Sequence, residues 1–301
     1  MSVPAAYIIV ILVWSTTPLG IKWSSAGIGY EYGVALRMII GLFALIMIAR
    51  LQRLPLPWNR QARYLYIVSG LSLFLTMASV YWAAQYIPSG WISVIFGLSP
   101  VLTSIFAMLI LHESTFTPGR IFGMLLGLSG LIVVFIEGLS ISTAALAGVA
   151  AVTFAASAQS LGAVIIRKLK PDIPAISITI GSLIVATPLF FANAFYNSNW
   201  PQTWPQQSVM AIVYLAILGT ALGFPLYYYL LKNINVERVA LITLITPVMA
   251  LLLGAAINNE EIGSQVWFGT ALILSGLAIY EYGKYLPFKK KWQIRWKQWP
   301  L

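Results

Sequence analysis

The chain of 301 residues is 59% hydrophobic and only 9% charged, and its mean hydropathy is +0.85. Because a soluble domain carries about 25% charged residues, this composition excludes an ordinary water-soluble protein and indicates a membrane protein. The net charge of +10 would suit nucleic acid, but the cations lie in short connections between apolar runs, so no nucleic-acid partner is expected. The absence of cysteine excludes disulfides, a thiolate nucleophile and a sulfur-ligated metal.

Apolar runs of membrane-spanning length recur from one end of the chain to the other and leave no room for a soluble domain. The fold class predicted from them is an all-α membrane protein in a lipid bilayer. Ten transmembrane helices are expected, at residues 4–23, 32–49, 62–85, 89–111, 119–137, 144–166, 174–194, 207–230, 237–257 and 264–283.

Two long segments, 81–113 and 228–260, repeat the same pattern. Tyr81, Pro100 and Glu113 of the first match Tyr228, Pro247 and Glu260 of the second, each pair 147 residues apart. A duplication of this period in a hydrophobic chain is typical of secondary transporters, which bind cargo between two halves. We therefore predict a first five-helix repeat over 1–140, a second over 141–287, and a basic cytoplasmic tail over 288–301.

The basic residues predict how the chain crosses the membrane. Sixteen of the eighteen lysines and arginines fall in alternate connections or in the C-terminal tail, which places them all on one side. The positive-inside rule makes that side cytoplasmic, together with both termini. The second set of five helices then runs in the opposite sense to the first, as an inverted repeat that can alternate between inward-open and outward-open states.

The motifs of the chain resemble a known family. Three segments are similar to the EamA family of the drug/metabolite transporter superfamily: WSTTPLGIKW near the start, ALRMIIGLFAL in the second helix, and SPVLTSIFAMLILHESTFTPGRIFGMLLGLSGLIVVF across the fourth and fifth helices. TPVMALLLGAAINNEEIGSQVWFGTALILSGLAIY resembles a second copy of the last of them. The resemblance covers the whole chain. It implies a ten-helix exporter of small metabolites in the bacterial inner membrane, with the first four helices of each half around the cavity and the fifth bracing it.

Pro100 and Pro247 fall within the paired helices 89–111 and 237–257. A proline inside a helix removes one hydrogen bond, which frees the carbonyls of Phe96 and Thr243. The hypothesis is that both helices bend at these prolines as gates; the alternative is a static kink that improves packing.

Aromatic and amide side chains are candidates for substrate binding. Trp14 lies deep in the first helix, and the repeat pairs Tyr81 with Tyr228, which favours Tyr228 among three consecutive tyrosines. The alternative for these rings is an ordinary place at the membrane interface. Gln159 is a buried amide, so it either bridges helices or touches substrate.

Arg37 is the one charge clearly inside a predicted span, about two turns from the outer end of its helix. It is a candidate for a substrate carboxylate, or it could reach outward and pair with Glu31 or Glu260. Lys22 has the same two interpretations, with the outward one favoured. Glu113 and Glu260 suit capping or pairing with a nearby cation more than proton carriage.

No aspartate or glutamate occupies the centre of a predicted helix. This argues against proton-coupled export of cationic drugs and favours neutral or zwitterionic cargo, most of all amino acids. An intramembrane enzyme lacks its catalytic groups here, and no Walker A loop is present, so no catalytic residue, metal or cofactor is expected. Transport of sugars or of nucleotide-linked or lipid-linked sugars is the alternative. A monomer or weak homodimer is predicted.

Overall fold

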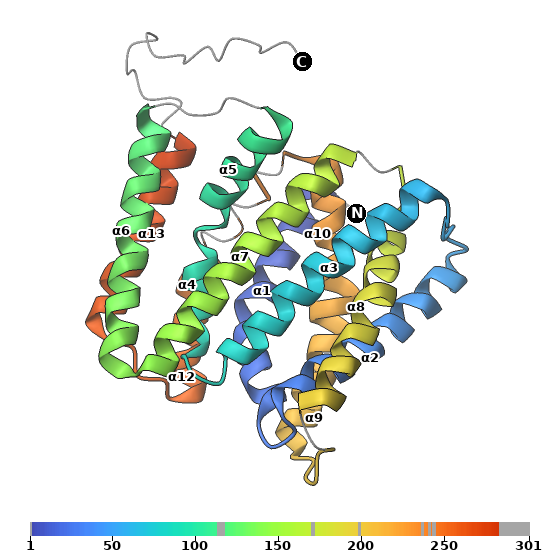
Figure 1. The fold of residues 1–301 in the computed structure, drawn as a ribbon, viewed down its shortest axis with the longest axis horizontal. Coiled ribbons are helices and arrows are strands. Elements are labelled where there is room, and N and C mark those ends of the chain that lie inside the picture. The colour runs from blue at the N-terminus through green and yellow to red at the C-terminus, as the bar shows by residue number, and fades with distance from the viewer. Residues whose placement is uncertain are drawn as a thin grey trace.

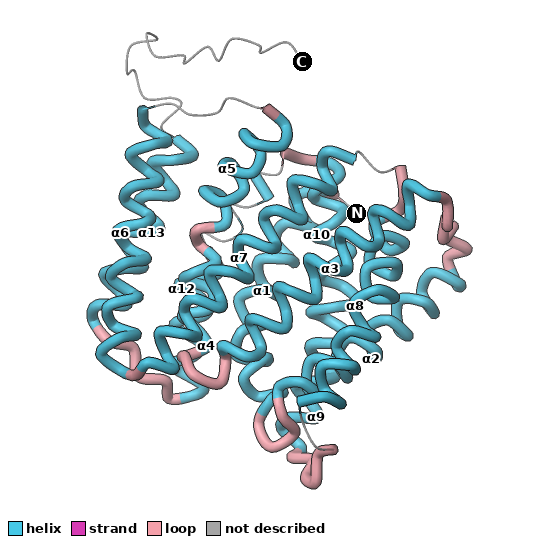
Figure 2. The backbone as a smooth tube through the Cα atoms, viewed as in Figure 1, coloured by secondary structure: helices cyan, strands magenta, loops and turns pink. Residues whose placement is uncertain are grey.

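The computed structural model describes residues 2–112, 118–169, 172–197, 200–235, 238–239, 242 and 245–282. Within these ranges every regular element is a helix (Figures 1 and 2). In chain order the helices are α1 (Val3–Ser25), α2 (Tyr30–Leu51), α3 (Arg60–Ala83), α4 (Ser89–Phe96), α5 (Ser99–Leu111), α6 (Pro118–Ile141), α7 (Thr143–Leu169), α8 (Ala175–Asn197), α9 (Gln206–Tyr214), the π-helix η1 (Leu215–Leu222), α10 (Gly223–Asn233), α12 (Thr246–Asn258) and α13 (Ser264–Tyr282).

The all-α fold class is confirmed. Seven segments of the described chain are long and apolar enough to cross a membrane, with α4–α5 and α9–α10 each forming one of them, and α6, α12 and α13 contribute three shorter apolar stretches. The number of ten spans and the repeat boundaries stay predictions, since the expected helix at 237–257 is described as a continuous helix only from Thr246 and the tail at 288–301 lies outside the described residues.

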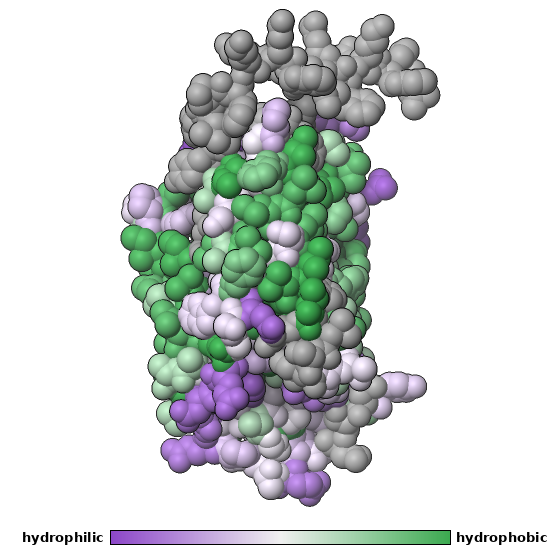
Figure 3. Space-filling view, turned by 90° about the vertical axis from the view of Figure 1, so that its left-hand side faces the viewer, coloured by the Kyte–Doolittle hydropathy of each residue, from purple (hydrophilic) through white to green (hydrophobic). Residues whose placement is uncertain are grey.

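The outer surface carries large apolar side chains, as a lipid-facing surface does. Phe43, Leu51, Leu125 and Phe268 are each more than half exposed. Figure 3 shows hydrophobic residues over most of the middle of one face, with hydrophilic residues gathered toward its lower end. Because lipid offers no hydrogen bonds, only helices with satisfied backbone groups suit this surface.

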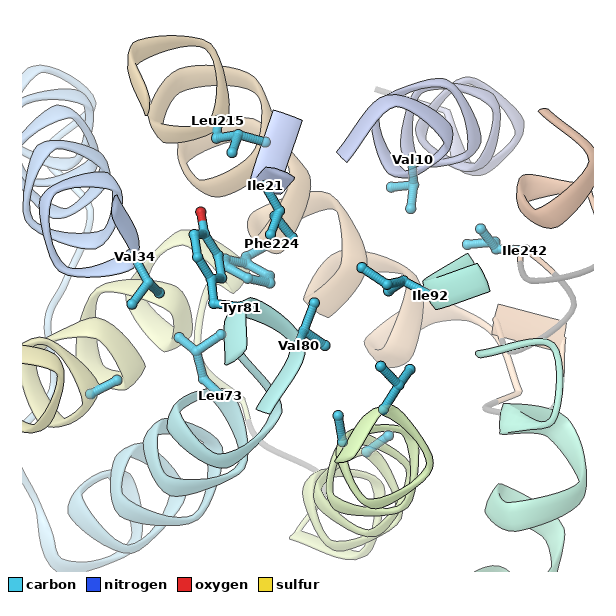
Figure 4. Close-up of a cluster of buried hydrophobic side chains, with 14 of the residues drawn as sticks. Val10, Ile21, Val34, Leu73, Val80, Tyr81, Ile92, Leu215, Phe224 and Ile242 are labelled. Carbon is cyan, nitrogen blue, oxygen red and sulfur yellow. The ribbon is translucent and has the colours of Figure 1, made fainter. Parts of the chain in front are cut away.

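Helix α1 runs through the middle of the bundle, where it contacts α2, α4, α9, α10 and α12. The core around it is apolar: Figure 4 shows Ile21, Val80, Ile92 and Phe224 reaching toward one another from α1, α3, α4 and α10. Helices α6 and α13 stand at one side of the bundle and pack mainly against each other (Figure 1).

Two of the long expected helices are interrupted. The helix expected at 89–111 breaks at Gly97 and Leu98 into α4 and α5, and the one expected at 207–230 contains the π-helical turn η1. Both Pro100 and Pro247 lie in the first turn of a helix, α5 and α12 respectively, so the prediction that they interrupt helices from within is wrong. Proline suits a first turn because the N–H it lacks would have no partner there.

Glycines bring α6 and α13 into backbone contact. A Cβ at Gly276 would lie 2.6 Å from the carbonyl oxygen of Gly123, and one at Gly130 would lie 2.6 Å from that of Gly269. In a membrane, where apolar side chains gain little by leaving lipid, such close approach supplies the packing that holds helices together. The glycine run in this part of the sequence therefore serves packing within the chain.

We expect Gly276→Ala to destabilise the protein by about 1–3 kcal/mol, because the added methyl group would clash with the backbone of α6 and force α6 and α13 apart. Gly127→Ala is the matched control, since a Cβ there meets only a side-chain carbon of Leu98 at 3.6 Å. Thermal unfolding in detergent measures both variants. Equal melting temperatures for the two would contradict the proposed packing.

Candidate functional site

A central cavity of about 80 Å³ lies between α1, α2, α3, α4, α7, α10 and α12. Its described lining consists mostly of apolar side chains with a few polar ones among them: Trp14, Thr17, Pro18, Ile21, Arg37, Met77, Val80, Ile92, Ser93, Phe96, Gln159, Phe224 and Thr246. Neither α6 nor α13 contributes to this lining. An apolar pocket with a few convergent polar groups is the usual form of a small-molecule site.

The central cavity continues toward the end of the bundle that carries Arg50, Arg167 and Lys232, here called the basic end. A connecting cavity of about 30 Å³ shares Trp14, Met77, Gln159 and Phe224 with the central one. It shares Ile166 and Tyr228 in turn with a vestibule of about 490 Å³, whose lining includes Arg167, Asp172 and Lys232. Shared walls place the three cavities in series.

Arg37 lies in the wall of the central cavity and is only 1% exposed. Its Nε donates a hydrogen bond to Thr220 Oγ1 at 2.9 Å, and Nη1 donates to the Tyr81 hydroxyl at 3.5 Å. Neither partner is charged. The outward reach expected as one alternative is wrong, and so is pairing with Glu260, which binds a different cation.

That cation is Lys22, whose Nζ lies 3.1 Å from Glu260 Oε1. The same oxygen accepts a hydrogen bond from Asn258 Nδ2 at 2.9 Å, and Oε2 accepts from both the backbone N–H and the hydroxyl of Ser89, each at 2.9 Å. These four residues, the Glu260 cluster, join α1, α4 and the end of α12. The expected pairing of Glu260 with a nearby cation is confirmed, whereas Glu113 lies outside the described residues.

The Glu260 cluster holds its carboxylate ionised. Burial of Glu260, whose side chain is 5% exposed, opposes ionisation, but the charge of Lys22 and the hydrogen bonds from Ser89 and Asn258 outweigh that effect. The pKa of Glu260 therefore lies below its ordinary value. The cluster lies just beyond the central cavity, since Lys22 follows the lining residue Ile21 and Ser89 precedes Ile92 by three residues, about 4.5 Å along a helix.

Trp14 and Gln159 both line the central cavity, as the candidate residues were expected to do. The ring of Trp14 lies 5.2 Å from that of Tyr227, and Tyr227 and Gln159 both line the connecting cavity. Side chains from α1, α10 and α7 thus meet at the connecting cavity, and Trp14 and Gln159 belong to the walls of both cavities.

Tyr228 and Tyr81 lie elsewhere than the repeat suggested. Tyr228 lines the connecting cavity and the vestibule, and its hydroxyl lies 3.4 Å from that of Ser182. Tyr81 is fully buried and contacts Arg37 and Ser24, so it stands behind the wall instead of in it. Pro100 and Pro247 do not line the central cavity either, although Phe96 and Thr246 beside the two helix starts do.

Sequence reasoning missed Thr220, Phe224 and Tyr227. Phe224 and Tyr227 are separated by one helical turn, a spacing that places two residues on one face and could have identified Tyr227. Thr220 could not have been found in this way, because it lies in the π-helical turn η1, where the angle between successive side chains departs from that of an α-helix.

Among the described residues, no group of three histidine, aspartate or glutamate side chains is placed to hold a metal ion.

Comparison with known proteins gives the family. The model of the EamA-like transporter family matches the chain twice, at residues 3–136 and 144–281. A solved crystal structure superposes with a TM-score of 0.70 at 21% identity, covering 93% of this chain and 97% of that one, which supports the fold.

Several relatives match this chain over most of their length. The uncharacterized transporter YoaV of Bacillus subtilis is 25% identical over 89% of this chain and 92% of its own, and a probable amino-acid metabolite efflux pump of Escherichia coli is 23% identical over 92% and 93%. The uncharacterized inner membrane transporter YedA of Escherichia coli matches at 29% over 26% of this chain and 25% of its own, in agreement with the predicted location in the cytoplasmic membrane. With both halves of the chain matched, this multi-pass membrane protein belongs to the EamA-like transporter family.

Proposed function

We propose that the protein exports small metabolites, amino acids or related neutral and zwitterionic compounds, across the cytoplasmic membrane by alternating access. The proposal uses the full predicted topology: two inverted five-helix repeats, with both termini and the basic end in the cytoplasm. Cargo binds in the central cavity beside Trp14, Gln159 and Arg37 and leaves at the opposite side of the membrane.

The observation that carries this proposal is the asymmetry of the cavities. Toward the basic end they continue in series through the vestibule, whereas toward the other end the Glu260 cluster ties α1, α4 and α12 together. With the basic end in the cytoplasm, this is the inward-facing member of an alternating-access pair. An exporter loads its cargo in this state.

Amino acids fit the chemistry of the lining better than the alternative cargoes do. The central cavity offers one cation among its described lining residues, and a sugar linked to a nucleotide or a lipid would bring several phosphate charges. The relative from Escherichia coli whose name mentions an amino-acid metabolite is consistent with this choice.

We expect purified protein in liposomes to catalyse counterflow of an amino acid. Vesicles loaded with one unlabelled amino acid should take up the same labelled compound faster than protein-free vesicles, with and without a pH gradient. Each of the twenty amino acids is tested in turn. If none exchanges while a sugar or a nucleotide-linked sugar does, the proposed substrate class is wrong and the alternative replaces it.

We expect Glu260→Gln to open the external path to the central cavity. Because the chain has no cysteine, Ser93→Cys in the cavity wall gives a single labelling site for a membrane-impermeant thiol reagent. Loss of the ion pair and its charge-assisted hydrogen bonds should raise the external labelling rate about tenfold. The matched control is Glu261→Gln at the exposed neighbouring position. Equal rates in the two variants would show that the Glu260 cluster does not close this side.

The stability that the cluster gives should depend on pH in one direction. Because the pKa of Glu260 is lowered in the folded state, its contribution is present above the unfolded value of about 4.3 and is lost as pH falls through the folded value. The difference in Tm between wild type and Glu260→Gln should be constant from pH 8 to about 5 and shrink below about pH 4. A difference already lost at pH 6 would contradict the ionised state assigned to Glu260.

A further inference from the structure

Arg37 and Lys22 are two cations in the same half of the bundle, and the structure treats them differently. Lys22 is partly exposed and has a carboxylate partner in Glu260 at 3.1 Å. Arg37 is buried, and among the described residues it makes hydrogen bonds only to the hydroxyls of Thr220 and Tyr81. No carboxylate of the described residues lies within ion-pair distance of it. A buried charge in this state is costly in a membrane, where no water solvates it.

The hydrogen-bonding capacity of Arg37 is also left incomplete. A guanidinium has five N–H donors, and the described contacts occupy two of them, one at a long 3.5 Å. Because Arg37 is one of the residues that line the central cavity, a molecule inside the cavity can reach its guanidinium. The fork of a guanidinium matches a carboxylate, which accepts two parallel hydrogen bonds from it.

The surrounding backbone is shaped to hold the guanidinium at this place. The π-helix η1 contains both Gly219 and Thr220, and a Cβ at Gly219 would lie 2.8 Å from Arg37 Nη2. A Cβ at Gly41 would lie 2.9 Å from Cβ of Thr220, so glycine in α2 lets this turn approach closely enough for Thr220 to accept from Nε. Such π-helical turns occur frequently at functional sites.

We propose that Arg37 binds the carboxylate of the transported compound, with Thr220 and Tyr81 as residues that position its guanidinium. This assignment rests on the proposed transport function and narrows it to molecules with a free carboxylate. A cationic group on the same molecule meets neutral oxygen atoms, those of Gln159, Ser93 and Thr246, but no carboxylate among the described lining residues. The site therefore accepts zwitterions and organic anions and disfavours the corresponding amides and esters, whose net charge is more positive.

The first test needs no knowledge of the substrate. If the partner of Arg37 is a ligand, the unpaired charge destabilises the ligand-free protein. The Arg37→Met variant should therefore unfold in detergent at the wild-type melting temperature or above it. Lys22→Met is the matched control and should melt lower, because it leaves the buried Glu260 without its counter-ion. If Arg37→Met melts well below wild type, the guanidinium has a structural role and the proposal is overturned.

The second test uses counterflow in liposomes, with leucine, leucinamide and leucine methyl ester as the first probes and the other amino acids with their amides next. Wild type should exchange an acid about tenfold to a hundredfold faster than its amide at equal concentration, the effect of charge-assisted hydrogen bonds. Arg37→Met should lose this preference and Arg37→Lys should keep part of it. Thr220→Val should raise the half-saturation concentration of the acid more than it lowers the maximal rate, and Thr220→Ser should restore it.

The outcomes separate the two proposals. If wild type exchanges acids and amides equally and Arg37→Met does the same, transport stands and the carboxylate site is wrong. If wild type exchanges no compound of the panel, the proposed transport of amino acids fails, and the melting temperatures of Arg37→Met and Lys22→Met still decide whether Arg37 carries an unpaired charge.

Discussion

The buried positive charge of Arg37 is the constraint around which the site is arranged. A guanidinium in this position has to be held by neutral groups, because a carboxylate nearby would neutralise it and remove any attraction for an anion. The structure supplies two hydroxyls from different helices, Thr220 of η1 and Tyr81 of α3. It also supplies glycines where α2 meets η1, so that Thr220 and the backbone of η1 can approach the guanidinium closely. Low dielectric surroundings then strengthen the interaction with whatever anion arrives.

Lys22, unlike Arg37, is paired with a carboxylate, and this ion pair makes the end of the bundle near Glu260 different from the basic end. Pairing Lys22 with Glu260 removes both charges from competition for cargo and uses them to join α1 to α12 and α4. Each of the two carboxylate oxygens of Glu260 accepts two hydrogen bonds from protein donors, so the hydrogen-bonding capacity of the carboxylate is filled within the cluster. An ionised group with this many partners is expensive to separate. In the proposed cycle, opening this end requires that cost to be met by the free energy of cargo binding or by new contacts at the basic end.

The fold was largely predictable from the sequence, and the site only in part. Hydropathy and the duplicated pattern around Pro100 and Pro247 are strong signals because the bilayer allows few alternatives to a helix. The intramembrane charge of Arg37 is a similar signal, since its burial demands a reason. Lys22 pairs with Glu260, and Arg37 donates to Thr220. The two residues of each pair are more than 180 positions apart in the sequence. Such pairs depend on how the helices pack, so no local sequence pattern predicts them. The repeat also misled, since it matched Tyr81 to Tyr228 although, of the two, Tyr228 lines the connecting cavity and the vestibule and Tyr81 lines none of the three described cavities.

Departures from regular α-helix gather around the central cavity. The break at Gly97 and Leu98 follows the lining residue Phe96, α12 begins at the lining residue Thr246, and η1 ends beside α10, which carries Phe224. Irregular backbone at membrane depth is tolerated only where protein or a cavity satisfies its polar groups, so these departures belong inside the bundle. The gating proposed at Pro100 and Pro247 then takes a specific form: because each proline lies in the first turn of its helix, α5 and α12 would move as rigid helices about their first turns.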